Sequence, residues 1–140
     1  MGWFAWVLVA VLFWGLGPVL AKIGLATVPP VPALTIRSVG VAITLLAVAI
    51  LRGALGELRA IEPRAAMYLL ADGLTGSLLA HLAYYYALRL GPASKVVPVS
   101  AAYPVLGVLL AALLLREQLT PGRIAGVAFI ALGVLLVRVF

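Results

Sequence analysis

Five long apolar runs, separated by short segments rich in charge, proline and glycine, constrain this chain more than any other feature. Each run has about the 20 residues that an α-helix needs to cross a bilayer. Hydrophobic side chains make up 66% of the sequence and charged ones 10%, whereas soluble domains have roughly 45 to 50% and 25%. We therefore expect an all-α, polytopic membrane protein with five transmembrane helices.

The runs predict the helices of a single transmembrane domain over residues 1–140. The expected helices are 3–23, 33–51, 65–88, 95–115 and 122–140. The first run has no charged n-region and is too long for a signal peptide, so we expect it to be a retained helix. The proline cluster of the first connection, Pro29, Pro30 and Pro32, suits an extended turn, because proline has a fixed φ and no N–H.

Composition excludes several function classes. The net charge is +6, but the ten Lys and Arg residues are spread singly between apolar runs, so we expect no nucleic-acid partner. The chain has no Cys and a single His, His81, which cannot form a protein metal site alone. No nucleophile and base form a recognisable pair, so we expect neither an enzyme nor a cofactor.

The distribution of Lys and Arg predicts dual topology. An odd number of helices puts the two ends on opposite sides, and positive charge in the connections decides the orientation. One side carries Arg52, Arg59, Arg64, Arg116 and Arg123, and the other carries Lys22, Arg37, Arg89, Lys95 and Arg138. Without a bias, the chain is expected to insert both ways and to pair as an antiparallel ten-helix homodimer. Such a dimer recreates the inverted repeat of many secondary transporters.

Two of the expected helix faces contain polar, aromatic or proline residues that a purely apolar helix does not need. Trp14, Pro18 and Lys22 recur at i, i+4 and i+8 and so share one face of the first helix. This pattern indicates either a kinked, cavity-lining helix or a packing kink with Lys22 snorkelling to the interface.

The fourth helix gathers small and polar residues within an arc of about 100 degrees. They are Ser100, Tyr103, Pro104, Gly107 and Ala111. Helix packing accounts for the small ones, whereas Ser100, Tyr103 and Pro104 favour the wall of a substrate cavity.

The fifth helix carries a stripe of glycines, Gly122, Gly126 and Gly133, which predicts a helix packing seam. Phe129 falls on the same stripe and interrupts it. The seam suits a dimer contact and a contact within the chain equally well.

Asp72 and His81 lie inside the third apolar run. Intramembrane acids are costly and usually functional, although Asp72 also suits an N-cap at the interface. In an α-helix the two residues occupy opposite faces, but they are equidistant from the centre of the 65–88 helix. An antiparallel dimer is therefore expected to bring Asp72 of one subunit level with His81 of the other, and such a pair can exchange a proton near neutral pH.

Four stretches together resemble the EamA-type proteins of the drug/metabolite transporter superfamily, especially its short five-helix bacterial and archaeal members. They are WGLGPVLAK (14–22), LTIRSVG around Arg37, ALRLGPASKVVPVSAAYPVL (87–106) and LLLREQLTPGRIAGVAFIALGVLL (113–136). Lys22, Arg37 and Glu117 stand at motif positions of that family. Arg116 replaces a residue that is usually Gly, and VSAAYP replaces a more polar stretch of some short members.

The resemblance implies passage of a small organic metabolite or drug through a ten-helix bundle by alternating access. It also implies a multi-pass protein in the cytoplasmic (plasma) membrane of a bacterium or archaeon. A non-transporting accessory or scaffold subunit of a heteromeric complex is the alternative function.

Overall fold

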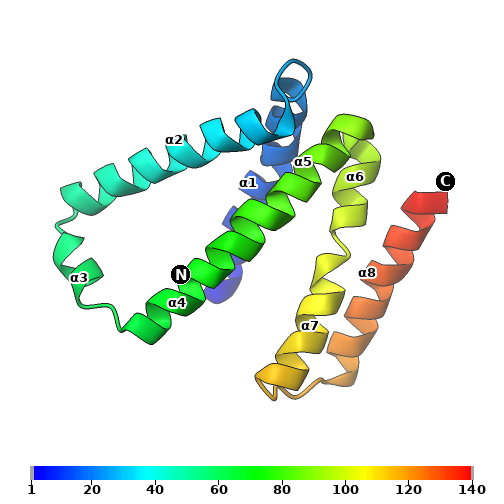
Figure 1. The fold of residues 1–140 in the computed structure, drawn as a ribbon. Helices are drawn as coiled ribbons and strands as arrows, with labels where there is room; N and C mark the ends of the chain where they lie inside the picture. The colour runs from blue at the N-terminus through cyan, green and yellow to red at the C-terminus, as the bar shows by residue number, and fades with distance from the viewer. Residues whose placement is uncertain (1, 140) are drawn as a thin grey trace. The chain divides into compact units, whose positions relative to one another are not determined.

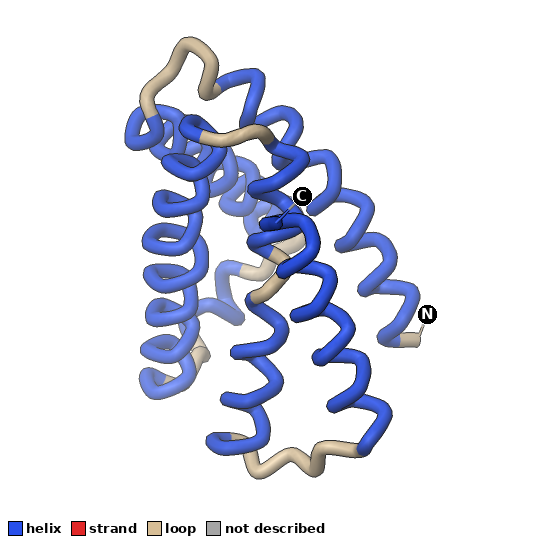
Figure 2. The backbone as a smooth tube through the Cα atoms, turned by 90° about the vertical axis from the view of Figure 1, so that its right-hand side faces the viewer, coloured by secondary structure: helices blue, strands red, loops and turns tan. Residues whose placement is uncertain are grey.

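The computed structural model describes residues 2–139, and every regular element in that range is a helix (Figures 1 and 2). The helices are α1 Trp3–Gly24, α2 Pro30–Leu51, α3 Leu55–Arg59, α4 Pro63–Asp72, α5 His81–Leu90, α6 Ala93–Ser100, α7 Tyr103–Leu114 and α8 Pro121–Val139, with the π-helix η1 Gly73–Ala80 between α4 and α5. The all-α fold class is confirmed.

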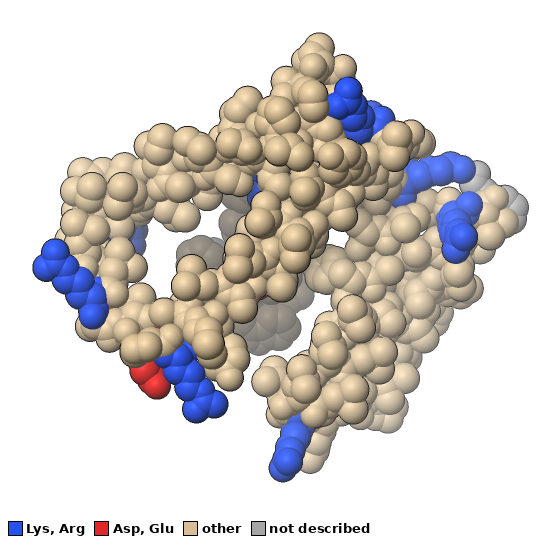
Figure 3. Space-filling model, viewed as in Figure 1, with Lys and Arg blue, Asp and Glu red and all other residues tan. Residues whose placement is uncertain are grey.

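Five segments are long and apolar enough to cross a membrane. They are Trp3–Gly24, Pro30–Leu51, Pro63–Leu90, Ala93–Leu114 and Pro121–Val139. On the face shown in Figure 3, Lys and Arg gather toward the ends of the helices, and most of the surface between them is uncharged. The five-helix prediction is therefore confirmed, and the surface pattern is that of helices which cross an apolar medium.

Prolines start three of these spans earlier than the hydropathy pattern predicts. The second, third and fifth spans begin at Pro30, Pro63 and Pro121. Proline is tolerated in the first helical turn, because the N–H that it lacks has no intrahelical acceptor there. Pro30 and Pro32 therefore belong to α2 and not to the connection. The predicted end of the last helix, Phe140, lies outside the described residues.

The third span is continuous in chain direction but changes its hydrogen-bonding pattern at its centre. Residues Gly73–Ala80 form a π-helix between two α-helical segments. The Thr75 hydroxyl donates to Ala71 O at 2.8 Å and to Asp72 O at 3.2 Å. Hydropathy periodicity gives no indication of this segment, and π-helical turns inside α-helices occur frequently at functional sites.

The fourth span is interrupted, whereas the sequence predicts one helix over 95–115. α6 ends at Ser100 and α7 begins at Tyr103. Pro104 has no N–H to offer to the carbonyl of Ser100, and Pro98 also lies inside α6. In the intervening turn Ala101 N–H still bonds Val97 O at 3.2 Å, but Ala102 N–H bonds Val99 O at 3.1 Å, three residues back, so the regular α-helical pattern breaks there.

The chain divides into two compact units. The central unit is Val19–Arg89, and the terminal unit combines Met1–Pro18 with Leu90–Phe140. In the terminal unit α8 packs beside α6 and α7. In the central unit Leu25, Leu34, Tyr85 and Leu88 form a small buried cluster.

Candidate functional site

Asp72 and His81 flank the π-helix at the centre of the third span. Asp72 is the last residue of α4 and His81 the first of α5. The backbone of Asp72 is helical, at φ −59° and ψ −48°, and its side chain makes no capping hydrogen bond. The N-cap alternative is therefore wrong, because the helix runs through Asp72 without a start there.

The π-helix changes which residues share a face. Nine residues separate Asp72 from His81, which is about 2.5 turns of an α-helix. Since i→i+5 bonding adds nearly one residue to each turn, the same step makes only about two turns here. By this count the two positions fall near one face of the helix and not on the opposite faces that an α-helix predicts.

Gly76 lies between these two side chains. His81 Nδ1 is 2.7 Å from Gly76 O, and a Cβ placed on Gly76 would be 3.7 Å from Asp72 Oδ1. The His81 ring also meets Tyr84 edge-on, with 6.5 Å between ring centroids. The carboxylate and the imidazole therefore both extend toward a residue without a side chain.

Lys22 connects α1 to the end of α5. Its ammonium donates a hydrogen bond to Leu88 O. The N–H that would normally bond this carbonyl belongs to the residue four positions later, which is Pro92 and has none. The positive charge also suits the negative end of a helix dipole. The contact places the ammonium group near the ends of α1 and α5, and the cavity wall and the snorkelling to the interface both stay predictions for Lys22.

The predicted cavity residues of the first and fourth helices are not gathered into one pocket. Trp14 of α1 and Tyr103 of α7 are 67% and 65% exposed, and Pro18 lies half-buried inside α1. The Ser100 hydroxyl donates to Val97 O at 2.7 Å. Their role in substrate binding stays a prediction.

One groove of the terminal unit collects several family-motif residues. It has a volume of about 420 Å³ and is lined by Pro104, Val108, Ala111, Glu117, Leu119, Arg123, Gly126, Val127 and Ile130. Of the predicted site residues, Pro104, Glu117 and Gly126 are thus brought together. Ser100 and Tyr103 are not among its lining residues.

The glycine stripe of α8 has open space beside it in the described chain. A Cβ added at Gly122, Gly126 or Gly133 would meet no described atom within 4 Å. There is thus room beside each of the three glycines, and both a dimer contact and a contact within the chain stay predictions for the stripe.

Arg37 and Arg116 are family-related positions with different local structures. Arg37 is exposed in the second turn of α2. Arg116 has φ +54°, the left-handed conformation that glycine adopts most easily. This explains why glycine suits that position, and Arg116 occupies it at a conformational cost.

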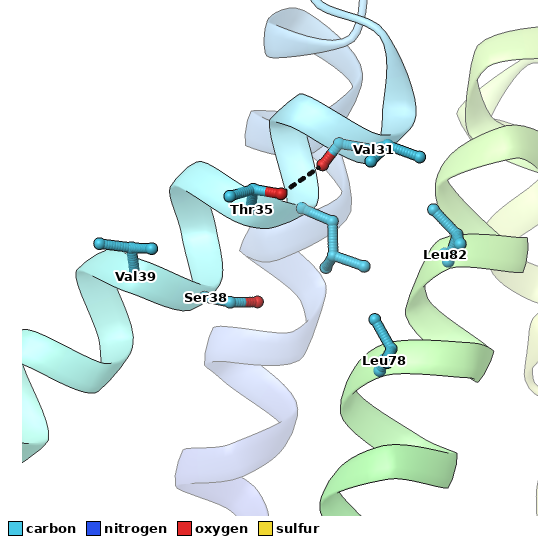
Figure 4. A pocket seen from close by; sticks show the side chains of 7 residues that line it. Val31, Thr35, Ser38, Val39, Leu78 and Leu82 are labelled. Atoms are coloured by element: carbon cyan, nitrogen blue, oxygen red, sulfur yellow. Dashed lines mark hydrogen bonds between the residues drawn. The ribbon is translucent and has the colours of Figure 1, made fainter.

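A second groove was missed by the sequence analysis. It lies in the central unit between α2 and the η1–α5 segment, has a volume of about 220 Å³ and is lined by Val31, Leu34, Thr35, Ser38, Val39, Leu78 and Leu82 (Figure 4). The Thr35 hydroxyl already donates to Val31 O at 3.0 Å. Thr35 and Ser38, polar residues one turn apart in an apolar helix, were the available signal.

Within residues 2–139 no three His, Cys, Asp or Glu side chains come close enough to hold a metal ion.

Comparisons with known proteins agree with this architecture. Residues 1–139 match the model of the EamA-like transporter family. An uncharacterized transporter of Sinorhizobium sp is 35% identical over 139 residues, covering 99% of this chain and 97% of the relative. An uncharacterized protein of Methanocaldococcus jannaschii is 42% identical over 64 residues, covering 46% of this chain and 44% of that protein. No solved structure matches.

Proposed function

Because the chain belongs to the EamA-like transporter family, we propose that it is a secondary transporter of a small organic metabolite or drug that works by alternating access. The family membership is the observation that carries the proposal. It supports a role in membrane transport. The proposed location is the plasma membrane of a bacterium or archaeon.

The proposed working form is an antiparallel homodimer. Among the described residues the hydrophobic core consists of four side chains, Leu25, Leu34, Tyr85 and Leu88, so one chain encloses little space of its own. When Arg37, seven residues inside the second span, is counted with the end at which α2 begins, each side carries five Lys and Arg residues, and such a balance favours insertion in both orientations. Two oppositely inserted copies supply the ten helices of an inverted repeat.

The third span has the symmetry that such a dimer uses. The span Pro63–Leu90 and the π-helix Gly73–Ala80 have the same midpoint, between Gly76 and Ser77. Asp72 and His81 are equally far from it. In an antiparallel pair Asp72 of one subunit therefore lies at the membrane depth of His81 of the other, where a carboxylate needs a partner.

In this proposal the first, third and fourth spans line the cavity. Trp14 and Tyr103 supply aromatic surface, Ser100 supplies a hydroxyl group, and Pro18 and Pro104 loosen helices that have to move. Trp14→Ala and Tyr103→Ala should reduce transport in proteoliposomes more than they reduce membrane expression. Trp6→Ala and Tyr68→Ala are matched controls, since Trp6 and Tyr68 are exposed to a similar extent. Equal losses in transport and expression would support a packing role.

A topology experiment tests the dimer. Reporters fused after Phe140 should reveal a cytoplasmic and an external population. One Lys added near Met1 should shift the ratio, because the count of positive charges is balanced without it. A single orientation that the added Lys does not change would contradict the antiparallel homodimer. A screen of amines, amino acids, sugars and organic acids in proteoliposomes tests transport itself.

A further inference from the structure

The Asp72 carboxylate has no partner in the described chain. Asp72 is exposed, and none of residues 2–139 donates a hydrogen bond to its carboxylate or forms an ion pair with it. It lies nine residues after Pro63, which is about 13 Å inside the span. A carboxylate at that depth is costly unless a cation or a hydrogen-bond donor reaches it.

The π-helix builds a notch next to this carboxylate. Asp72, Gly76 and His81 follow one another at steps of four and five residues, which keeps them on one face of a helix with i→i+5 bonds. Gly76 contributes no side chain between them. Asp72 Oδ1 lies 3.7 Å from the Cβ position of Gly76, and His81 Nδ1 lies 2.7 Å from Gly76 O. The carboxylate and the imidazole thus both lie next to Gly76, a position without side-chain bulk.

The hydrogen bond of His81 determines whether the notch presents hydrogen-bond donors or acceptors to a ligand. Gly76 O has no proton, so Nδ1 must be the donor in this contact. In a neutral imidazole Nε2 then carries the lone pair and accepts. The notch thus presents two acceptors, a carboxylate and Nε2. The Thr75 hydroxyl adds no donor, because it already donates to Ala71 O and Asp72 O.

We propose that this notch binds an organic ammonium ion, a small molecule with a protonated amine, through the Asp72 carboxylate and His81 Nε2. The inference rests on the proposed transport function and names the substrate class. An ammonium group supplies both the positive charge that Asp72 lacks and the several N–H donors that two acceptors require. No Lys or Arg occurs between Arg64 and Arg89, so this span itself offers no cationic side chain to an anion.

The single histidine of the chain provides a direct readout. In full-length protein labelled with ¹⁵N-histidine in lipid nanodiscs, the unliganded imidazole should show a protonated Nδ1 and an unprotonated Nε2. Hexylammonium should shift the Nε2 resonance in a saturable manner. Hexyltrimethylammonium, which has charge without N–H groups, should bind at least about tenfold more weakly, and hexanoate should leave the resonance unchanged.

Three variants locate the binding. Asp72→Asn keeps the side-chain shape and should weaken hexylammonium binding by about tenfold to a hundredfold. Gly76→Ala fills the notch and should also weaken it, while the fold tolerates the new Cβ at ordinary contact distance from Asp72. Gly73→Ala is the matched control in the same π-helix, since its Cβ meets no described atom within 4 Å. This control should keep the wild-type affinity.

The outcomes distinguish a failure of the proposed ammonium site from a failure of the transport proposal. Three results would each overturn the proposal that the notch binds an ammonium ion. They are an unprotonated Nδ1 in the unliganded protein, an equal response of the Nε2 resonance to hexanoate, and an unchanged affinity for hexylammonium in Asp72→Asn. If a neutral or anionic compound is transported while hexylammonium leaves the Nε2 signal unchanged, the proposed ammonium site is wrong and the transport proposal is supported. If hexylammonium binds as expected while no compound crosses the membrane, ammonium binding at the notch is supported and the transport proposal is wrong.

Discussion

The two units of the chain differ in how much of their packing they supply themselves. All buried residues among those described belong to the central unit, namely Leu25, Pro30, Leu34, Tyr85 and Leu88. The terminal unit has no buried residue in the described range, although α8 packs beside α6 and α7. The central unit therefore has a local core, whereas the terminal unit depends on lipid or another copy to cover its apolar surface.

The largest expected effect is the loss of that core. Leu88 is 0% exposed, so Leu88→Ala should lower the free energy of unfolding by about 2 to 4 kcal/mol. Leu106→Ala is the control in the terminal unit, because Leu106 is 61% exposed and leaves no cavity. Thermal unfolding of both variants in detergent measures the difference, and equal stabilities would remove the contrast between the units.

The next effect concerns the Lys22 contact of the central unit. Lys22→Met keeps the length of the side chain but removes the donor to Leu88 O. We expect a loss of about 1.5 to 3 kcal/mol, since the bond involves a charged group and leaves a carbonyl unsatisfied. Lys22→Arg should retain most of the stability. Lys95→Met, the control in α6, should change it little, and a similar loss there would indicate a general charge effect.

A smaller effect is expected from the uncovered side of the terminal unit. Gly126→Leu should weaken dimerisation by about tenfold, or about 1.4 kcal/mol, because bulk on the glycine stripe separates packed helices. Folding of the single chain should be spared, since Gly126 has open space beside it. Gly40→Leu in α2 of the central unit is the control, also at an open position. Unchanged dimerisation of Gly126→Leu, measured by sedimentation equilibrium, would assign the stripe to lipid.

The smallest effect is a gain in stability. Arg116 has φ +54°, and a non-glycine residue in this conformation costs roughly 1 kcal/mol or more. Arg116→Gly should therefore raise the free energy of unfolding by about 1 kcal/mol in the terminal unit. Arg116→Ala serves as the control, because it removes the charge and keeps the strain. If both variants are equally stable, the charge and not the backbone explains the effect.

The candidate site shows which of its features can be predicted from residue patterns in the sequence. Asp72 and His81 were identified from the sequence alone, because charged and titratable side chains in an apolar run are rare. Their shared face was not, since α-helical periodicity assumes i→i+4 bonding and η1 departs from it. The bond from Lys22 to Leu88 O joins residues 66 positions apart, and no local pattern contains that information.

By itself the sequence determined that the chain is helical, that it has five spans and where its charges lie. Lipid offers no hydrogen bonds to the backbone, so an apolar run of sufficient length has to satisfy its own polar groups as a helix. Only the tertiary structure decided that Lys22 bonds Leu88 O near the end of α5, that Leu88 is enclosed and that the His81 ring bonds Gly76 O within a π-helix. These features depend on contacts and hydrogen-bond registers between residues, which hydropathy does not encode.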